Sequence, residues 1–195
     1  MKFQLHYPFK HFFVTQKWGN PNPAYAQFGF TKHNGVDCIS GYANTQSYYA
    51  PTTWPVWCPV EGFRVDKVQY RENGGGNEMW LISKEPLEVG DKTCYVYLVL
   101  AHAEKIFLKA GDEPKIGELM MIADSTGFST GAHTHIGMYR VDKNVASWTS
   151  IDQNEANGSH DPALYFTGKY AIDIVDFSTL LRGVLRYAQY YTTGS

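Results

Sequence analysis

The run Cys94-Tyr95-Val96-Tyr97-Leu98-Val99-Leu100-Ala101-His102 places a single histidine after an unbroken series of apolar and aromatic residues. A short run of this kind, rich in Val, Leu and Tyr, predicts a buried β-strand. His102 stands at the end of that strand, which is a natural place for a polar side chain to emerge from the core into a groove. The run therefore predicts a core strand and a candidate functional residue together.

Outward from this run, short apolar or alternating segments are separated by turn residues, which is the pattern of an all-β protein. Turn signals lie at 19–23, 73–77, 89–92 and 109–114. We expect strands at 12–18, 33–39, 56–60, 63–70, 79–83, 94–101, 119–123 and 133–141. A long aromatic loop is expected at 41–55.

The C-terminal segment has a different pattern. Its apolar residues recur at helical spacing, at Ile174, Phe177, Leu180, Leu181, Val184, Leu185 and Ala188. This spacing predicts one amphipathic helix between Asp173 and Tyr191, whose role we expect to be packing.

The composition argues against several classes of protein. Apolar residues make up 44% of the 195 residues and the net charge is −2, so disorder is not expected and no basic block suggests nucleic-acid binding. No stretch approaches the ~18 apolar residues of a membrane span. The N-terminus lacks the apolar core of a signal peptide, so no export signal is expected in this chain. Cys38, Cys58 and Cys94 are widely spaced, which favours buried, reduced thiols.

The first candidate metal ligands are His33 and Asp37. Gly35 and the neighbouring turn residues argue against a helix here. In an extended chain, the even spacing places both side chains on one face, with Val36 and Cys38 on the other. Imidazole nitrogen and carboxylate oxygen both suit zinc.

A second pair, His133 and His135, lies in Gly131-Ala132-His133-Thr134-His135-Ile136-Gly137. The i, i+2 spacing on a strand again puts both imidazoles on one face. A catalytic zinc takes three protein ligands and one open position, so His33, Asp37 and one histidine of this pair make a complete set. The other histidine and His102 then supply groups for hydrolysis, one accepting a proton from water and the other stabilising the oxyanion or protonating the amine.

These motifs resemble those of the lysostaphin/LytM family of peptidoglycan endopeptidases. That family carries HxxxD, a lone histidine after an apolar strand, and a Gly-, Ser- and Thr-rich loop that ends in HxH. Here the motifs are His33–Asp37, Leu100-Ala101-His102, and the segment STGFSTGAHTH at 125–135. The resemblance covers roughly residues 12–166.

The resemblance implies one zinc ion per chain, held by His33, Asp37 and His135, with His102 and His133 as the catalytic pair. It also implies a mainly β fold whose antiparallel sheets form a groove, a lysostaphin-like barrel-sandwich, to which the C-terminal amphipathic helix is added. We expect an endopeptidase domain at 1–170 and a helical extension at 171–195, packed on or beside it. The expected partner is bacterial cell-wall peptidoglycan.

The chain departs from the family pattern in the segment after Asp37, which is long and aromatic here. Its aromatic side chains either pin the loop by packing or line the groove; they are Tyr42, Tyr48, Tyr49, Trp54 and Trp57. The middle residue of the HxH motif is Thr134, and Ala103 follows His102. Strand parity places both off the metal face, so these departures concern packing.

Two alternatives to an enzyme share the same fold: a non-catalytic module that binds peptidoglycan or another partner, and a structural phage tail component. The complete set of five residues favours the enzyme. The lack of a signal peptide favours a phage or prophage origin, in the host cytoplasm before lysis or in the virion tail, although a trimmed extracellular domain looks the same. Glycine bridges, D-Ala linkages of the stem peptide and the bond from D-Glu to the diamino acid are all compatible substrates.

Overall fold

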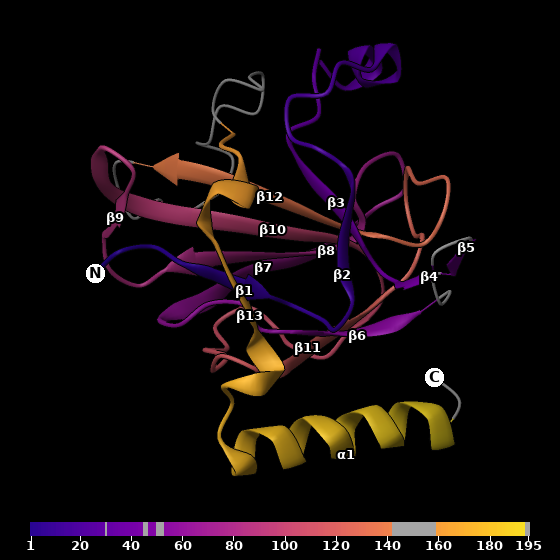
Figure 1. Ribbon diagram of the computed structural model, residues 1–195, viewed down its shortest axis with the longest axis vertical. Coiled ribbons are helices and arrows are strands. Elements are labelled where there is room, and N and C mark those ends of the chain that lie inside the picture. Colours follow the sequence, from indigo (N-terminus) through magenta and orange to yellow (C-terminus); the bar gives the residue numbers. More distant parts are fainter. Residues whose placement is uncertain (30, 45–46, 50–52, 142–158, 194–195) are drawn as a thin grey trace.

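The computed structural model describes residues 1–29, 31–44, 47–49, 53–141 and 159–193. Its main feature is an antiparallel sheet that contains nine strands of the described chain (Figure 1). The path of the sheet runs through β2 (Phe12–Gln16), β3 (Gly35–Ser40), β12 (Thr134–Val141), β10 (Lys92–Ile106), β11 (Leu119–Ala123) and β6 (Trp54–Trp57). The expected mainly β fold with antiparallel pairing is confirmed.

Three further strands join this sheet through β10. They are β7 (Phe63–Arg71), β8 (Gly76–Ser83) and β9 (Leu87–Val89). Because β8 pairs with β10 and β7 pairs with β8, the β7–β8 hairpin extends the sheet on the side of β10 opposite to β12. The long apolar strand found in the sequence is thus the centre of the sheet.

β10 continues past the expected end at Ala101 to Ile106. Up to Ala101 it pairs with β12, and from Ala103 it pairs with β11 instead. His102 lies between these two pairings and has a left-handed backbone, with φ +65°. The strand therefore bends and changes its neighbour at the residue predicted to emerge from the core.

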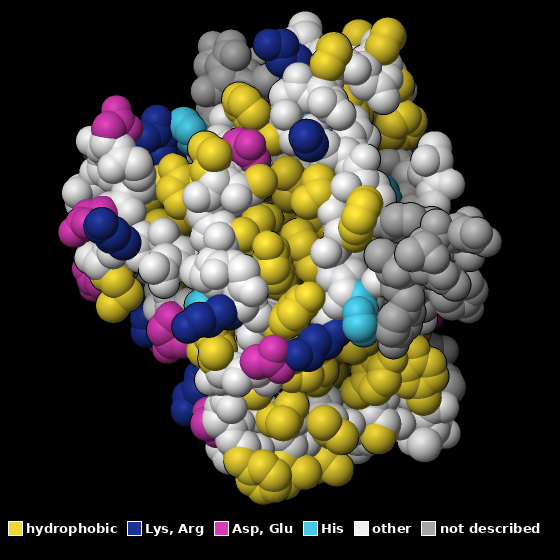
Figure 2. All heavy atoms as spheres, in the orientation of Figure 1, with side chains coloured by type: hydrophobic (Ala, Val, Ile, Leu, Met, Phe, Trp, Pro, Cys, Tyr) yellow, Lys and Arg dark blue, Asp and Glu magenta, His cyan; other side chains and the backbone are white. Residues whose placement is uncertain are grey.

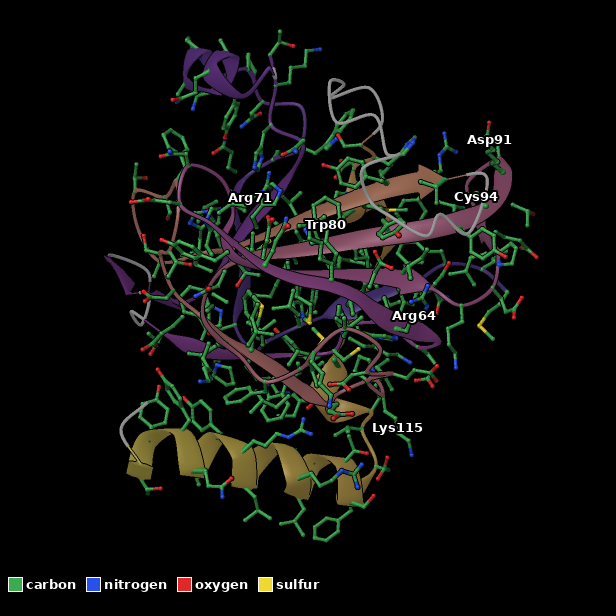
Figure 3. All side chains as sticks on the ribbon, turned by 180° about the vertical axis from the view of Figure 1, so that it is seen from behind. Arg64, Arg71, Trp80, Asp91, Cys94 and Lys115 are labelled. Carbon is green, nitrogen blue, oxygen red and sulfur yellow. The ribbon has the colours of Figure 1, made fainter. Side chains whose placement is uncertain are left out.

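The sheet has two faces of different character. One face packs into the main core, to which Val36, Cys38 and Leu100 contribute. The other face carries a smaller cluster around Trp80, which Figure 3 labels, and Tyr139. Alternation along β3 puts Val36 and Cys38 in the core as expected, and the side chain between them, Asp37, on the second face.

The C-terminal helix α1 (Phe177–Thr193) packs against β11, below the sheet in Figure 1. Its contact face differs from the apolar stripe seen in the sequence. Gly183 fits against the Trp57 ring, where a Cβ would lie 2.5 Å from a ring carbon, and Arg186 pairs with Glu118 at 2.9 Å. Most of the apolar stripe is exposed, including Phe177 and Leu185, and apolar groups gather at this end in Figure 2. The helix packs through Gly183, Arg186 and the rings of Tyr187 and Tyr190, none of which belongs to the apolar stripe selected by sequence periodicity.

Several short elements were not expected. β1 (Leu5–Tyr7) pairs in parallel with β13 (Phe166–Tyr170), which brings the N-terminal segment beside the segment that precedes α1. β4 (Tyr42–Asn44) and β5 (Ser47–Tyr49) form a separate hairpin in the aromatic loop. Short 3-10 helices lie at Pro23–Phe28, Pro162–Tyr165 and Ala171–Asp173.

The three cysteines are buried and form no disulfide, as their spacing predicted. Among the described helices, none has the length and apolar character to cross a membrane.

Candidate metal centre

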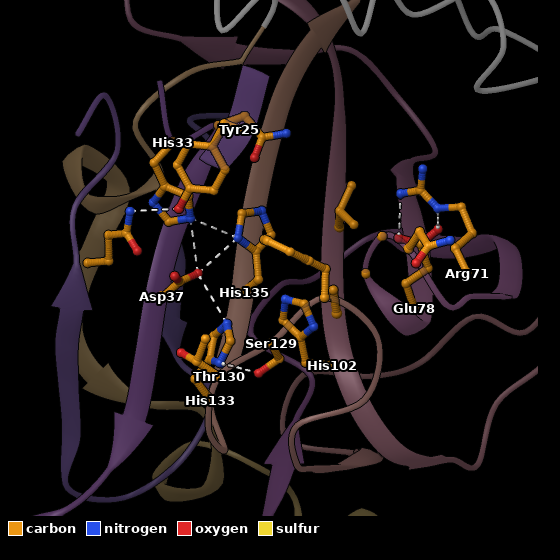
Figure 4. A pocket seen from close by; sticks show the side chains of 18 of the residues that line it. Tyr25, His33, Asp37, Arg71, Glu78, His102, Ser129, Thr130, His133 and His135 are labelled. Atoms are coloured by element: carbon orange, nitrogen blue, oxygen red, sulfur yellow. Dashed lines mark hydrogen bonds and ion pairs between the residues drawn. The ribbon is translucent and has the colours of Figure 1, made fainter. Parts of the chain in front are cut away.

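Three predicted ligands converge on one point of the second sheet face (Figure 4). His33 Nε2 lies 3.1 Å from Asp37 Oδ1. His135 Nδ1 lies 2.9 Å from the same oxygen and 3.1 Å from His33 Nε2. A tetrahedral zinc with bonds of about 2.0–2.1 Å separates its ligand atoms by roughly 3.3 Å. The triangle of donor atoms is thus close to the size that zinc requires.

Strand register places two of these three ligands. Asp37 on β3 is directly opposite His135 on β12, so both side chains project from the same face. His33 lies in the loop before β3 rather than on an extended strand as expected. Its backbone is held to Gly19 and Asn20 by hydrogen bonds of 2.8 and 2.9 Å.

Hydrogen bonding fixes which nitrogen of His33 faces the centre. His33 Nδ1 is 3.1 Å from the carbonyl oxygen of Lys17, and a carbonyl only accepts, so Nδ1 carries the hydrogen and donates it. The lone pair is left on Nε2, which points to Asp37 and His135. Such a backbone contact is the usual means of orienting a metal-bound histidine.

Gly35 makes room for the His135 ring. A Cβ at position 35 would lie 2.7 Å from the ring atoms of His135 and 2.4 Å from the backbone oxygen of Ile136. A larger residue would therefore push the imidazole out of place. Gly35, the glycine of the HxxxD motif, therefore allows His135 on the neighbouring strand to keep its position.

The electrostatics favour an anionic Asp37 and a neutral His135. Burial opposes ionisation of Asp37, but the hydrogen bond from His135 Nδ1 and the nearby His33 outweigh it and hold the pKa of this carboxyl well below its usual range. Burial lowers the pKa of His135, against the opposing effect of Asp37. A carboxylate and neutral imidazoles are the protonation states that bind a divalent metal.

His102 and His133 lie beside this triangle without being part of it. Their ring centroids are 4.4 Å apart, and His133 Nε2 is 3.6 Å from Asp37 Oδ1. His102 Nδ1 donates to the Thr126 carbonyl at 2.8 Å, and His133 Nδ1 donates to the Gly131 carbonyl at 2.8 Å. In both rings Nε2 is therefore the nitrogen that carries the lone pair.

The backbone of Asp124 ties these two histidines together. Its N–H donates to the His102 carbonyl and its carbonyl accepts from the His133 N–H, each at 3.0 Å. The His102 N–H in turn donates to Gly75 at 2.7 Å. Asp124 thus joins the two histidine-bearing segments through its main chain.

The site opens into a groove of about 400 Å³ that the five residues share. Burial and the nearby charges of His133 and His135 lower the pKa of His102 to about 3, so its ring is neutral near pH 7. The structure thus brings every predicted site residue to one groove.

Tyr25 also lines this groove and was missed in the sequence. Its ring stacks on His33 with centroids 5.7 Å apart, and its hydroxyl accepts a hydrogen bond from Gln16 Nε2 at 2.7 Å. Burial and the charge of Asp37 raise the pKa of the phenol, so Tyr25 keeps a proton to donate. It lies in the 3-10 helix Pro23–Phe28, within a segment that reads only as a Pro- and Asn-rich loop, so no periodicity could have marked it.

The other histidines have structural partners. His6 Nδ1 is 2.8 Å from the Thr167 hydroxyl, and His160 accepts from Arg140 at 2.9 Å. Asp161 caps the 3-10 helix Pro162–Tyr165.

Trp54 and Trp57 are buried at 3% and 6% exposure, so they pin the aromatic loop rather than line a groove. The side chains of Tyr42, Tyr48 and Tyr49 lie outside the described part of the chain.

Comparison with known proteins places this geometry on a known fold. No family model matches the chain. It is 32% identical over 117 residues, 60% of its length, to an uncharacterized metalloprotease of Haemophilus influenzae, and the match spans 20% of that protein. It resembles the catalytic domain of the antimicrobial peptidase lysostaphin from Staphylococcus simulans, with TM-score 0.53 and 22% identity over 79% of this chain and 91% of that chain.

A similar likeness, with TM-score 0.52 and 12% identity, relates this chain to a chain of the SpoIIQ–SpoIIIAH pore forming complex; it covers 84% of this chain and 90% of that chain. At these identities the likeness concerns the fold, which is lysostaphin-like.

Proposed function

We propose that the chain is a zinc-dependent endopeptidase that hydrolyses peptide bonds in bacterial peptidoglycan. The observation that carries this proposal is the meeting of three metal-binding atoms, on His33, Asp37 and His135, with two histidines whose Nδ1 atoms are fixed to backbone carbonyls. The match to a metalloprotease over 117 residues supports a peptidase.

The donor set fits zinc. Two imidazole nitrogens and one carboxylate oxygen are typical zinc ligands, and the donor spacing of 2.9–3.1 Å agrees with a tetrahedral site. Zinc bound there would supply Lewis acidity, which polarises an amide carbonyl and lowers the pKa of water so that it becomes a nucleophile near neutral pH.

His102 and His133 are the groups that transfer the proton from the attacking water. Each offers an Nε2 lone pair in its resting state, so each can accept the hydrogen of an attacking water and return it to the leaving amine nitrogen. Neither neutral ring has an N–H left for the groove, because both Nδ1 hydrogens are engaged with carbonyls. Tyr25 is therefore the better donor to the oxyanion, in place of the histidine that the sequence suggested.

A bacterial cell-wall substrate is supported by the motifs shared with the lysostaphin/LytM family. The fold shared with a peptidase described as antimicrobial is consistent with it. The groove holds about 400 Å³, enough for several residues of an extended peptide.

A non-catalytic module is the second candidate, since the same fold occurs in a pore forming complex. The intact set of three metal-binding and two proton-accepting residues argues for hydrolysis, because a binding module has no use for fixed histidine tautomers.

Zinc content and wall hydrolysis, measured on the same samples, test the proposal. Wild type, His133→Ala and His160→Ala should each hold about one zinc per chain by elemental analysis. Wild type and His160→Ala should solubilise purified cell walls and release new amino termini, whereas His133→Ala should do neither. His160 is the matched control because it lies outside the groove, bonded to Arg140. Zinc-loaded wild type that binds walls but releases no amino termini would establish the binding module instead.

A further inference from the structure

The row of side chains that contains the metal centre continues across the sheet. Asp37 is opposite His135, and His135 is opposite Ala101 on β10. On the next strand, β8, Glu78 occupies the following place in the row and is opposite Gln69 on β7. Neighbouring strands lie roughly 4.8 Å apart, so Glu78 is about 10 Å from His135 along the groove floor. His135, Ala101 and Glu78 all line the groove.

Glu78 is a buried carboxylate at this far end of the groove. It is 1% exposed and receives two parallel hydrogen bonds from Arg71, Nε at 2.6 Å and Nη2 at 2.9 Å. Gln69 donates a further hydrogen bond to it. Three donors on one carboxylate fix the plane of the guanidinium. Figure 4 shows the pair across the groove from His135, and the Arg71 side chain keeps 41% of its surface exposed.

Gly74 and Gly75 allow the loop 72–75 to pack closely against this pair. A Cβ at Gly74 would lie 3.2–3.3 Å from the Arg71 side chain, and one at Gly75 would lie 2.4 Å from Glu78 Oε2. The carbonyl of the same Gly75 holds the His102 N–H. The pair is thus built into the hairpin that also positions a catalytic residue.

Arg71 is the cation at this end of the groove. Lys67 lies on the same strand, within electrostatic range of Arg71 and of two carboxylates, Glu78 and Asp66. Because the Arg71 side chain keeps 41% of its surface exposed, a second carboxylate can approach it from the groove, and arginine is well suited to bridge two carboxylates.

We propose that Arg71 binds a carboxylate of the substrate peptide, at a place about three residues from the bond that is cleaved. The spacing follows from the distance of about 10 Å and the rise of roughly 3.3 Å per extended residue. Glu78 and Gln69 act as positioning residues for the guanidinium. The inference rests on the proposed endopeptidase function, and it selects carboxylate-bearing stem peptides over uncharged glycine bridges.

Two pairs of synthetic peptides test this subsite. One pair carries an internal carboxylate or its carboxamide, and the other carries a terminal carboxylate or its amide. Dissociation constants by calorimetry and kcat/KM by release of amino termini are measured for wild type, Arg71→Lys, and the double variant Arg71→Gln/Glu78→Gln, which leaves no buried charge unpaired. Arg64→Gln is the matched control: Arg64 lies on the same strand, is ion-paired with Asp66, and does not line the groove (Figure 3).

In one or both pairs, wild type and Arg64→Gln should bind the carboxylate peptide about 10-fold more tightly than its amide, the effect of one charge-assisted hydrogen-bonded pair. Arg71→Lys should keep part of this preference, and the double variant should lose it while melting cooperatively. The pair that shows the preference identifies the source of the carboxylate.

Equal binding of acid and amide by wild type, no binding of either, or a preference that survives in the double variant would each overturn the subsite. Hydrolysis without acid preference would support the endopeptidase function and overturn the subsite. Acid-dependent binding without hydrolysis would keep the subsite and overturn the proposed function.

Discussion

Asp37 and His135 face each other across two regularly paired strands, whereas His102 and His133 are held where strand pairing breaks. On the regular side, side-chain direction follows from alternation along β3 and β12. On the irregular side, direction depends on a left-handed residue and on main-chain bonds to Asp124 and Gly75. The comparison teaches that sheet register places two of the three metal-binding groups, whereas irregular backbone places the two histidines proposed to move protons.

The largest expected effect comes from comparing substitutions on the two faces of β3. Asp37→Ala should abolish zinc binding and reduce wall hydrolysis by on the order of a thousandfold or more, because it removes a charged donor from the centre. Cys38→Ala, one residue along and buried in the core, should cost roughly 1 kcal/mol of stability while keeping zinc and activity. Elemental analysis, hydrolysis rates and urea unfolding distinguish them. Full zinc occupancy in Asp37→Ala would contradict the assigned centre.

The next effect concerns the irregular side. His102→Asn should lower kcat by roughly 100-fold or more while retaining zinc, because it removes a proton acceptor and leaves the ligands in place. Asparagine tolerates φ +65°, whereas alanine does not, so His102→Ala should lose about 1 kcal/mol more stability than His102→Asn. Equal stability of the two variants would show that the left-handed backbone is not retained.

Lowering the pH should reduce the free energy of unfolding of the metal-free protein, because the buried imidazoles of His102 and His135 resist protonation. The pKa of His102 is about 3 in the folded protein and near 6.5 when unfolded, so the unfolded chain binds the proton more tightly. Its contribution to stability is complete above pH 6.5 and falls with pH by about 1.4 kcal/mol per unit until pH 3. His135 acts in the same direction, whereas Asp37 loses its contribution only below its unfolded pKa of 3.8.

Urea unfolding of EDTA-treated protein at pH 7, 6 and 5 measures this effect. His102→Asn should show a shallower dependence on pH than wild type, by up to about 2 kcal/mol between pH 6.5 and 5. Parallel pH profiles for the two proteins would contradict the burial argument.

The smallest effect compares two threonines. Thr134 Oγ1 is buried with no hydrogen-bond partner within the described part of the chain, whereas Thr126 Oγ1 donates to Ala103 at 2.8 Å and accepts from the Asn77 N–H at 3.1 Å. Thr134→Val should raise the free energy of unfolding by about 1 kcal/mol, and Thr126→Val should lower it by about 1–2 kcal/mol. Chemical denaturation measures both, and a loss of stability in Thr134→Val would point to an unidentified partner for its hydroxyl.

Sequence reasoning succeeded where alternation governs. The strand positions of Asp37 and His135, the core positions of Val36 and Cys38, and the antiparallel β class all follow from period-two spacing. It failed where position depends on a partner distant in the chain. Tyr25 reaches the groove from a 3-10 helix in a Pro-rich loop.

The helix α1 and the hairpin residues show the same limit. α1 buries Gly183 and Thr179 rather than Leu181 or Leu185, because its partner is the flat ring of Trp57. Arg71 and Glu78 are brought into contact by the pairing register of the β7–β8 hairpin. Amphipathic spacing and single charged residues carry no information about such partners.

The pairing of β3 with β12 also links metal binding to folding. Asp37 and His135 are 98 residues apart in the chain, so the pairing of β3 with β12 is a long-range contact. Contacts between such distant segments form slowly, since the intervening chain must first be ordered. We therefore expect high-affinity zinc uptake to require the β3–β12 pairing, so that bound metal during refolding would report the formation of that pairing.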